Sequence, residues 1–290
     1  MSISTEGTVV LGRYRATFMF KQRLLSGIVL VLVIAVTLYF GGTVTLFVMG
    51  AVSLIGMYEL YRIYQIEKCA LSYLSYLAAI LYYSMIAIEI PRGYFVLFVG
   101  YLMLLMTVYV IRYPKYQAEQ IMAAFFGLFY VAIMISFVYK LRMLPTGGYL
   151  VVLIFLSSWG CDTLAYCTGM LIGKHKMSPI LSPKKTIEGA VGGVVGAVLL
   201  GVLYAFVVQN HIYFGYRVML VYPILCGGGA VLSMIGDLAA SAIKRNHNVK
   251  DYGKLIPGHG GILDRFDSMI FTAPTIYYLM MALTNGVLMN

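Results

Sequence analysis

The stretch GAVGGVVGAVLLGVLYAFVV, residues 189–208, contains no charged side chain over 20 consecutive residues. A helix of about 20 apolar residues is long enough to cross the roughly 30 Å hydrocarbon core of a membrane. Similar segments recur along the chain of 290 residues, which is 61% hydrophobic and only 11% charged. Because a soluble domain carries about 25% charged residues, the sequence predicts an all-α polytopic membrane protein.

Nine apolar segments are predicted to be transmembrane helices joined by short polar connections. They cover residues 24–40, 44–61, 71–88, 94–111, 121–138, 149–171, 189–208, 218–238 and 268–285. The first is interpreted as a retained membrane anchor, because it is long and lacks a clear small-residue cleavage site. The four cysteines form no CxxC motif, so they are expected to be buried free thiols and indicate neither zinc nor a disulfide.

Basic residues are distributed unequally between the two sides of the predicted membrane. When the polar segments are numbered alternately from the N-terminus, one set holds 17 of the 21 Lys and Arg residues. The positive-inside rule places this set, the N-terminus and the two longest connections, 172–188 and 239–267, in the cytoplasm. The formal charge of +10 is explained by this asymmetry and does not require nucleic acid as a partner.

Acidic residues suggest a division of the chain into two regions. All five aspartates lie at or after residue 162, whereas the first half contains only scattered glutamates. Residues 1–140 are therefore predicted to be a transmembrane scaffold. Residues 141–290 are predicted to be the catalytic transmembrane region.

Asp162 lies inside a predicted span, in the sequence SSWGCDTLAYCTGMLIGK. A carboxylate within a span costs about 2.5–3.5 kcal/mol to insert, and such residues tend to face a partner or a water-filled cavity. Asp162 is therefore predicted to bind substrate, and a structural hydrogen bond to a neighbouring helix is the alternative. Gly169 and Gly173 lie four residues apart, a spacing that lets another helix approach closely.

The segment SPILSPKKTIEG, residues 178–189, is a candidate phosphate-binding loop. Its two Ser-Pro pairs interrupt helical structure. Lysines and hydroxyls before a helix N-terminus can bind phosphate, although the glycine pattern of a P-loop is absent. The alternative is that the lysines only anchor the connection in the cytoplasm. The predicted substrate-binding residues here are Ser182, Lys184, Lys185 and Thr186.

Three aspartates near the last two spans are predicted to form a metal–phosphate site. Asp237 ends one span, and Asp264 and Asp267 share a helix face if the next helix begins there. Mg²⁺ usually bridges one or two carboxylates to substrate phosphates, and the glycines of PGHGG let backbone amides approach an anion. The alternative is a solvated loop followed by a capped helix start.

The stretch SAIKRNHNVKDYGKLIPGHGGILDRFD, residues 241–267, resembles the signature of the phosphatidate cytidylyltransferases, also called CDP-diacylglycerol synthases. The segments around Asp162 and Lys184 also resemble elements of this family, so the similarity extends from about residue 155 to the C-terminus. The matching signature positions are Ser241, Lys244-Arg245, Lys250-Asp251, Gly253, Ile256, Pro257, His259-Gly260-Gly261 and Asp264-Arg265-Phe266-Asp267.

This resemblance implies an enzyme of a bacterial-type cytoplasmic membrane that makes CDP-diacylglycerol and pyrophosphate from CTP and phosphatidate. It also implies Mg²⁺ as the cofactor, with K⁺ as a possible second cation, and a homodimer surrounded by membrane lipids. The expected metal ligands are Asp237 and Asp264, with Asp267 as a ligand or close neighbour. The expected catalytic residues are these three aspartates together with Lys244 and Arg265. The remaining expected substrate-binding residues are Arg245, Lys250, His259, Gly260 and Gly261.

The chemistry of this reaction suits the predicted residues. The attacking lipid phosphate is already an anion, so the main obstacles are repulsion between two anions and charge on the leaving pyrophosphate. Metal ions and positioned Lys and Arg side chains reduce both. Since the acyl chains must stay in lipid, the site is expected to open sideways to the bilayer near the cytoplasmic leaflet.

Two other functions remain as alternatives. A CTP-dependent polyprenol kinase would transfer the γ-phosphate and release CDP, so the released product distinguishes it. An ion-coupled transporter would use Asp162 and Asp237 as coupling groups, but the inverted repeat typical of such proteins is not found. The DxxDGxxAR motif of the CDP-alcohol phosphotransferases is absent.

Overall fold

The structure is a computed structural model that describes residues 25–212, 217–258 and 260–284. His259 and the N-terminal basic residues Arg13, Arg15, Lys21 and Arg23 lie outside these residues. So do the first residue of the first predicted span and the last residue of the ninth.

The predicted all-α membrane architecture is confirmed. Within the described ranges, eight helices are long and apolar enough to cross a membrane, and a shorter apolar helix, Leu25–Phe40, precedes them. In chain order, the helices after it are α2 (Gly42–Ile63), α3 (Ala70–Ala87), η1 (Pro91–Gly93), α4 (Tyr94–Ile111), α5 (Ala118–Gly127), η2 (Leu128–Ile133), α6 (Met134–Arg142), α7 (Gly147–Phe155), η3 (Leu156–Gly160), α8 (Cys161–Ile172), α9 (Ile187–Val208), η4 (Gln209–His211), α10 (Val218–Asn246) and α11 (Leu263–Leu283). The segments η2 and η3 are π-helical, so α5–α6 and α7–α8 each form one continuous span.

The predicted connection 239–267 is wrong at both ends. Helix α10 continues to Asn246, and α11 begins at Leu263, so only residues 247–262 connect the two helices. Lys244 and Arg245 are therefore helical. Both residues have good helix propensity, and cations are favoured in the last turn by the helix dipole. Hydropathy alone ended the helix too early because its final turns are polar.

A β-hairpin occupies part of the connection 172–188 and was not predicted. Strands β1 (Lys176–Ser178) and β2 (Ser182–Thr186) pair antiparallel, with Ser178 opposite Ser182. Ser178 ends β1 and the pair Ser182-Pro183 begins β2, so the two Ser-Pro pairs flank the turn, and the predicted interruption of helical structure is confirmed. Thr186 then caps α9, because its hydroxyl accepts a hydrogen bond from the amide of Gly189 at 3.1 Å.

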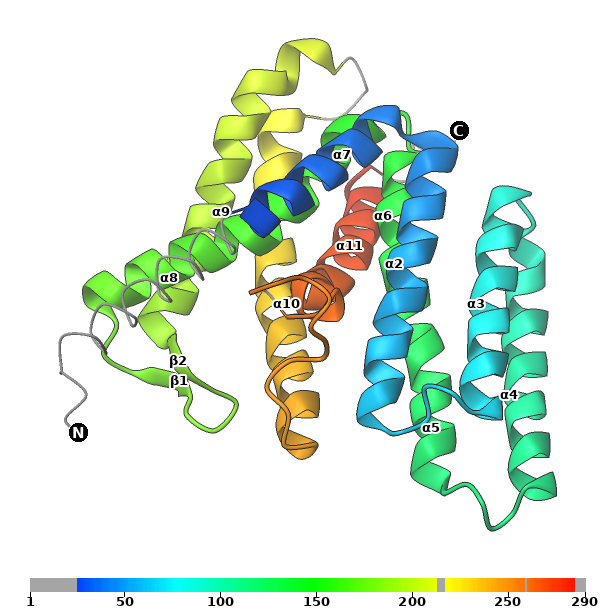
Figure 1. The fold of residues 1–290 in the computed structure, drawn as a ribbon. Helices are drawn as coiled ribbons and strands as arrows, with labels where there is room; N and C mark the ends of the chain where they lie inside the picture. The colour runs from blue at the N-terminus through cyan, green and yellow to red at the C-terminus, as the bar shows by residue number, and fades with distance from the viewer. Residues whose placement is uncertain (1–24, 213–216, 259, 285–290) are drawn as a thin grey trace, which may run out of the picture.

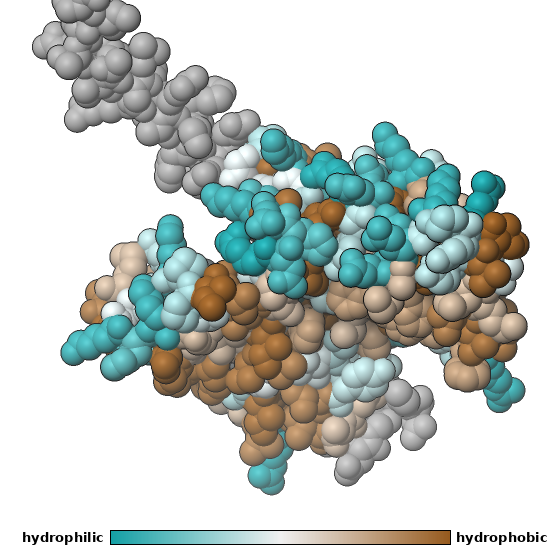
Figure 2. Space-filling model, turned by 90° about the horizontal axis from the view of Figure 1, so that it is seen from below, coloured by the Kyte–Doolittle hydropathy of each residue, from teal (hydrophilic) through white to brown (hydrophobic). Residues whose placement is uncertain are grey.

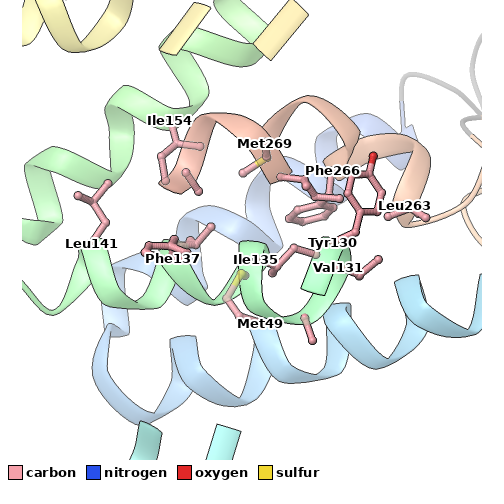
Figure 3. Close-up of a cluster of buried hydrophobic side chains, with 14 of the residues drawn as sticks. Met49, Tyr130, Val131, Ile135, Phe137, Leu141, Ile154, Leu263, Phe266 and Met269 are labelled. Atoms are coloured by element: carbon pink, nitrogen blue, oxygen red, sulfur yellow. The ribbon is translucent and has the colours of Figure 1, made fainter. Parts of the chain in front are cut away.

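The last helix is packed against the first half of the chain. Figure 3 shows Leu263, Phe266 and Met269 of α11 beside Tyr130 and Val131 of η2. In Figure 1, α11 lies between α10 on one side and α2 and α6 on the other, while α3 and α4 form the outer edge. Helix α11 is thus held by the N-terminal half of the chain.

Hydrophilic residues gather at one end of the molecule in the view of Figure 2. Seen from the end at which α10 meets the connection 247–262, much of the surface is hydrophilic, whereas the flanks are hydrophobic (Figure 2). This distribution agrees with a protein whose sides face lipid and whose connections face water.

Close packing of α8 and α9 depends on glycines. A Cβ atom at Gly169 would lie 3.6 Å from the Cα atom of Gly189, as the predicted small-residue spacing implies. A Cβ atom at Gly193 would lie 2.8 Å from the Cβ of Ala165 and 2.9 Å from the carbonyl oxygen of Cys161. The first turns of α8 are therefore held directly against α9.

Replacing Gly193 by Leu is expected to destabilise the protein by about 1–3 kcal/mol, because the added side chain has no space between α8 and α9. The measurement is the midpoint of thermal unfolding in detergent. The control is Val195→Leu on the exposed face of the same helix, which should leave the midpoint unchanged. Equal midpoints for both variants would contradict the packing described here.

Candidate active site

A cavity of about 570 Å³ lies between α8, the β-hairpin, the start of α9 and α10. Its volume is in the range typical of small-molecule sites. It brings together six residues that were predicted separately from three parts of the sequence. These lining residues are Asp162, Ser182, Lys184, Lys185, Thr186 and Asp237.

Lys185 and Asp237 form the charged centre of this cavity. The ammonium group of Lys185 donates a hydrogen bond to Oδ2 of Asp237. Burial lowers the pKa of Lys185, but the carboxylate of Asp237 outweighs burial, so the pKa lies above its ordinary value. Asp162 interacts with the same ammonium group. Lys185 is therefore a fixed cation facing two carboxylates.

One wall of the cavity is apolar and exposed. Tyr166 and Met170 of α8 line the cavity, although 67% and 68% of their surface is accessible. Both residues lie in a membrane-spanning helix. The cavity therefore has one wall that carries lysines and hydroxyl groups and one wall continuous with the apolar surface.

A second charged cluster lies at the start of α11. The ammonium group of Lys244 donates to Oδ1 of Asp264 at 2.8 Å and lies 3.9 Å from Oδ2 of Asp267. The other oxygen of Asp264 accepts hydrogen bonds from the backbone amides of Tyr252 at 2.8 Å and Gly261 at 2.9 Å. Asp264 and Asp267 share one helix face, as predicted, and both oxygens of Asp264 are engaged.

The two clusters form one polar region. Asp237 and Asp267 are close enough to repel each other, and Arg265 interacts with both Asp162 and Asp267. The helices are in direct contact here, since a Cβ atom at Gly236 would lie 2.9 Å from the carbonyl oxygen of Asp267. The aspartates of the two segments therefore meet, as the sequence suggested.

Two glycines of the connection 247–262 adopt backbone conformations that favour glycine. Gly258 and Gly260 have φ angles of 77° and 85°, a region that other residues rarely adopt. The amide of Ile256 donates to the carbonyl of Gly260 at 2.9 Å, which closes the loop. This closure places Gly261 beside Asp264.

Four predicted substrate-binding residues do not line the cavity: Gly260 and Gly261 lie beside Asp264, and Arg245 and Lys250 lie elsewhere. Arg245 and Lys250 are exposed, and the guanidinium of Arg245 donates to the carbonyl of Val249 at 3.3 Å. Neither residue lines the cavity. Their predicted role stays untested, as does that of His259, which lies outside the described residues.

The donor groups fit a magnesium ion held partly by substrate. In the described part of the chain, no three His, Cys, Asp or Glu side chains converge into a complete metal site. Mg²⁺ commonly takes only one or two carboxylates and completes its shell with phosphate oxygens and water. Asp237 and Asp267, which interact electrostatically, would supply such a pair. The predicted ligand Asp264 accepts hydrogen bonds on both oxygens, and its role in metal binding stays a prediction.

Unpaired polar atoms beside this pair also indicate a polar ligand. Among the described residues, the hydroxyls of Tyr130 and Ser233 and the Nε of Arg265 are buried without a hydrogen-bond partner. Buried polar groups normally have one. Tyr130 interacts electrostatically with both Asp267 and Asp237. Tyr130 and Arg265 therefore bring unpaired polar atoms to the carboxylates that the ion would share.

Known proteins resemble most of the chain. A model of the cytidylyltransferase family matches residues 21–283. The chain belongs to the cytidylyltransferase family. It is 31% identical to the phosphatidate cytidylyltransferase of Bacillus subtilis over 270 residues, covering 90% of this chain and 97% of that protein.

Other members of the family match shorter stretches. The phosphatidate cytidylyltransferase of Synechocystis is 45% identical over 139 residues, which cover 48% of this chain and 45% of that protein. The one from Thermotoga maritima is 36% identical over 172 residues, covering 59% of this chain and 63% of that protein.

Residues of this cytidylyltransferase that sequence reasoning missed come from its N-terminal half. Glu59 of α2 is buried against the signature connection, and Tyr130 of η2 interacts electrostatically with Asp237 and Asp267. A carboxylate within a predicted span was the available signal for Glu59, but its position near a span end made it resemble an interfacial residue. No comparable signal marked Tyr130 among 25 tyrosines.

Proposed function

We propose that this integral membrane protein is a phosphatidate cytidylyltransferase, which transfers the cytidylyl group of CTP to phosphatidate and releases pyrophosphate. The observation that carries the proposal is the cavity in which Lys185 faces Asp162 and Asp237 beside the Lys244–Asp264–Asp267 cluster. The names and coverage of the relatives support the same activity.

The cavity accounts for both substrates. Lys184, Lys185 and Ser182 provide cationic and hydroxyl groups for the triphosphate of CTP. The apolar wall at Tyr166 and Met170 lets the acyl chains of phosphatidate remain in lipid while its phosphate enters the cavity.

The reaction needs positioning and charge neutralisation. An oxygen of the lipid phosphate forms a bond to the α-phosphorus of CTP, and the bond from this phosphorus to the bridging oxygen of pyrophosphate breaks. Because the nucleophile is already anionic, no side chain has to remove a proton from it. Lys185 and Arg265 place positive charge near the phosphates. Mg²⁺ bound by Asp237 and Asp267 would supply further charge neutralisation.

The sidedness and assembly of the protein are part of the proposal. The excess of basic residues in one set of connections supports a cytoplasmic active site, where CTP is available. A homodimer and a second cation such as K⁺ are the remaining expectations. Crosslinking in intact membranes and turnover with K⁺ replaced by Na⁺ test them.

The decisive experiment is turnover of labelled CTP by purified protein in detergent micelles containing phosphatidate. We expect CDP-diacylglycerol and pyrophosphate in equal amounts, no product after EDTA treatment, and recovery on adding Mg²⁺. Release of CDP with a phosphorylated lipid would instead support a lipid kinase. Absence of any lipid-dependent turnover would overturn the proposal.

Lys185→Gln is expected to lower kcat/KM for CTP by about 10²-fold, because it removes a half-buried cation beside the proposed phosphate site and leaves Asp237 without its partner. Lys184→Gln is the matched control in the same strand. Its decrease in kcat/KM should be smaller than that of Lys185→Gln, because Lys184 is exposed. Equal effects of the two substitutions would show that the lysines act only through general charge.

A further inference from the structure

Glu59 of α2 reaches the start of α11 from the other half of the chain. Its two carboxylate oxygens accept hydrogen bonds from the backbone amides of Ile262 at 3.1 Å and Leu263 at 2.8 Å. Only 4% of Glu59 is exposed. Three residues further along α2, the guanidinium of Arg62 donates to the carbonyl of Tyr252 at 2.8 Å. One end of α2 therefore holds both ends of the segment 252–263.

This carboxylate supplies the N-terminal cap that α11 lacks. The residue at the N-cap position is Ile262, which has no side-chain acceptor. The first amides of a helix have no partner within the helix, and their partial positive charge favours a carboxylate. Glu59 satisfies two of these amides, and Asp264 satisfies the preceding one at Gly261. Two carboxylates therefore share three consecutive amides.

Two glycines of the signature make room for Glu59. A Cβ atom at Gly253 would lie 2.1 Å from Oε1 of Glu59, and a Cβ atom at Gly261 would lie 2.4 Å from both of its oxygens. The three nearest atoms to that position of Gly261 all belong to Glu59. Gly261 does not have a positive φ angle, so its lack of a side chain is explained by the carboxylate and not by backbone conformation.

We propose that Glu59 is a positioning residue for the cytidylyl transfer, which keeps the aspartates of α11 available to cations. Without Glu59, the amides of Ile262 and Leu263 would be left as buried donors without an acceptor. The nearest carboxylate that can turn back to them is Asp264, which would then leave Lys244. Occupation of these amides by Glu59 thus maintains the orientation of Asp264 and Asp267. This inference rests on the proposed function.

The test uses the full-length protein with Glu59 replaced by Ala, Gln and Asp. We expect Glu59→Ala to lower kcat by about 10²-fold, as displacement of reacting groups commonly does, and to raise the Mg²⁺ concentration needed for half-maximal turnover. Glu59→Gln keeps the shape but only one acceptor oxygen, and Glu59→Asp keeps the charge on a shorter chain. Both should restore part of the loss, and Glu59→Gln also covers the case in which Glu59→Ala does not fold.

The control is Ser53→Ala in the same helix. Ser53 is buried and shares a 2.8 Å hydrogen bond with Tyr83, away from the signature connection. Its loss should lower the unfolding temperature while kcat and the Mg²⁺ midpoint stay at wild-type values. If Glu59→Gln and Glu59→Ala behave like Ser53→Ala, the role of Glu59 is only structural and the inference is wrong.

A double substitution tests the contact itself. Gly261→Ala should reduce turnover in the wild-type background, because its methyl group collides with Glu59. Added to Glu59→Ala, it should cause no further loss, since the obstructing carboxylate is gone. Multiplicative losses would contradict the contact. Hydrogen exchange provides a readout independent of activity: the amides of Ile262 and Leu263 should exchange faster in Glu59→Ala than in Ser53→Ala.

The activity of the wild-type protein distinguishes failure of the proposed function from failure of the inference about Glu59. If it forms no CDP-diacylglycerol, the proposed function fails and the catalytic part of this inference fails with it. If it is active and Glu59→Ala is equally active with an unchanged Mg²⁺ midpoint, the inference alone is overturned.

Discussion

Asp237→Asn is expected to reduce formation of CDP-diacylglycerol by about 10³-fold, the upper range for loss of one electrostatic group at a reacting centre. Asp237 links the cavity to the cluster of Lys244, Asp264 and Asp267. Its carboxylate accepts a hydrogen bond from Lys185 in the cavity and interacts electrostatically with Asp267. The substitution removes a proposed ion ligand. It also leaves Lys185 without its charged partner.

The measurement is turnover as a function of Mg²⁺ concentration in detergent micelles. Residual activity of the Asp237→Asn variant should respond weakly to Mg²⁺, since only one carboxylate of the pair remains. Glu119→Gln is the control, because Glu119 is exposed in the first turn of α5. Near-normal turnover of Asp237→Asn with an unchanged Mg²⁺ response would remove Asp237 from the metal site.

The membrane fold was predictable from the sequence because its strongest determinant is local. Each span needs about 20 apolar residues whatever it packs against, so the nine segments were visible one at a time. The ends of the helices were less predictable. The last turns of α10 are helical although they are polar. Lys244 in these turns is buried and contacts Asp264, so it does not face solvent.

The residues of the candidate site were predictable, but the ion pairs that they form were not. Charged residues within apolar spans stand out, so Asp162 and Asp237 were found without a structure. The ion pairs that divide the site, Lys185 with Asp237 and Lys244 with Asp264, join residues 52 and 20 positions apart. Nothing in their spacing shows which lysine meets which aspartate.

The contribution of the first half of the chain was not predictable. Glu59 meets Leu263 across 204 positions, a contact created by the packing of α2 beside α11. A single glutamate near a span end is compatible with an interfacial residue and with a buried one. Only the three-dimensional arrangement distinguishes the two, so the region 1–140 was interpreted as scaffold alone.

Lys244→Met is expected to produce the largest loss of stability, about 3–5 kcal/mol, because it leaves a buried carboxylate without its cation. The side chain of Asp264 is only 3% exposed and that of Lys244 only 10%. Methionine fills a similar volume, so the effect comes from charge and not from a cavity. The measurement is thermal unfolding in detergent, with Lys254→Met, an exposed position in the connection 247–262, as the control.

A second substitution separates the charge effect from general damage to the helix. In Lys244→Met combined with Asp264→Asn, the uncompensated charge is gone, and the amide oxygen still accepts from the backbone amides of Tyr252 and Gly261. The double variant should therefore unfold at a higher temperature than Lys244→Met alone, although both lose activity. If the double variant is the less stable of the two, Asp264 is stabilised by its backbone amides without help from Lys244. The buried ion pair would then contribute nothing to holding α10 and α11 together.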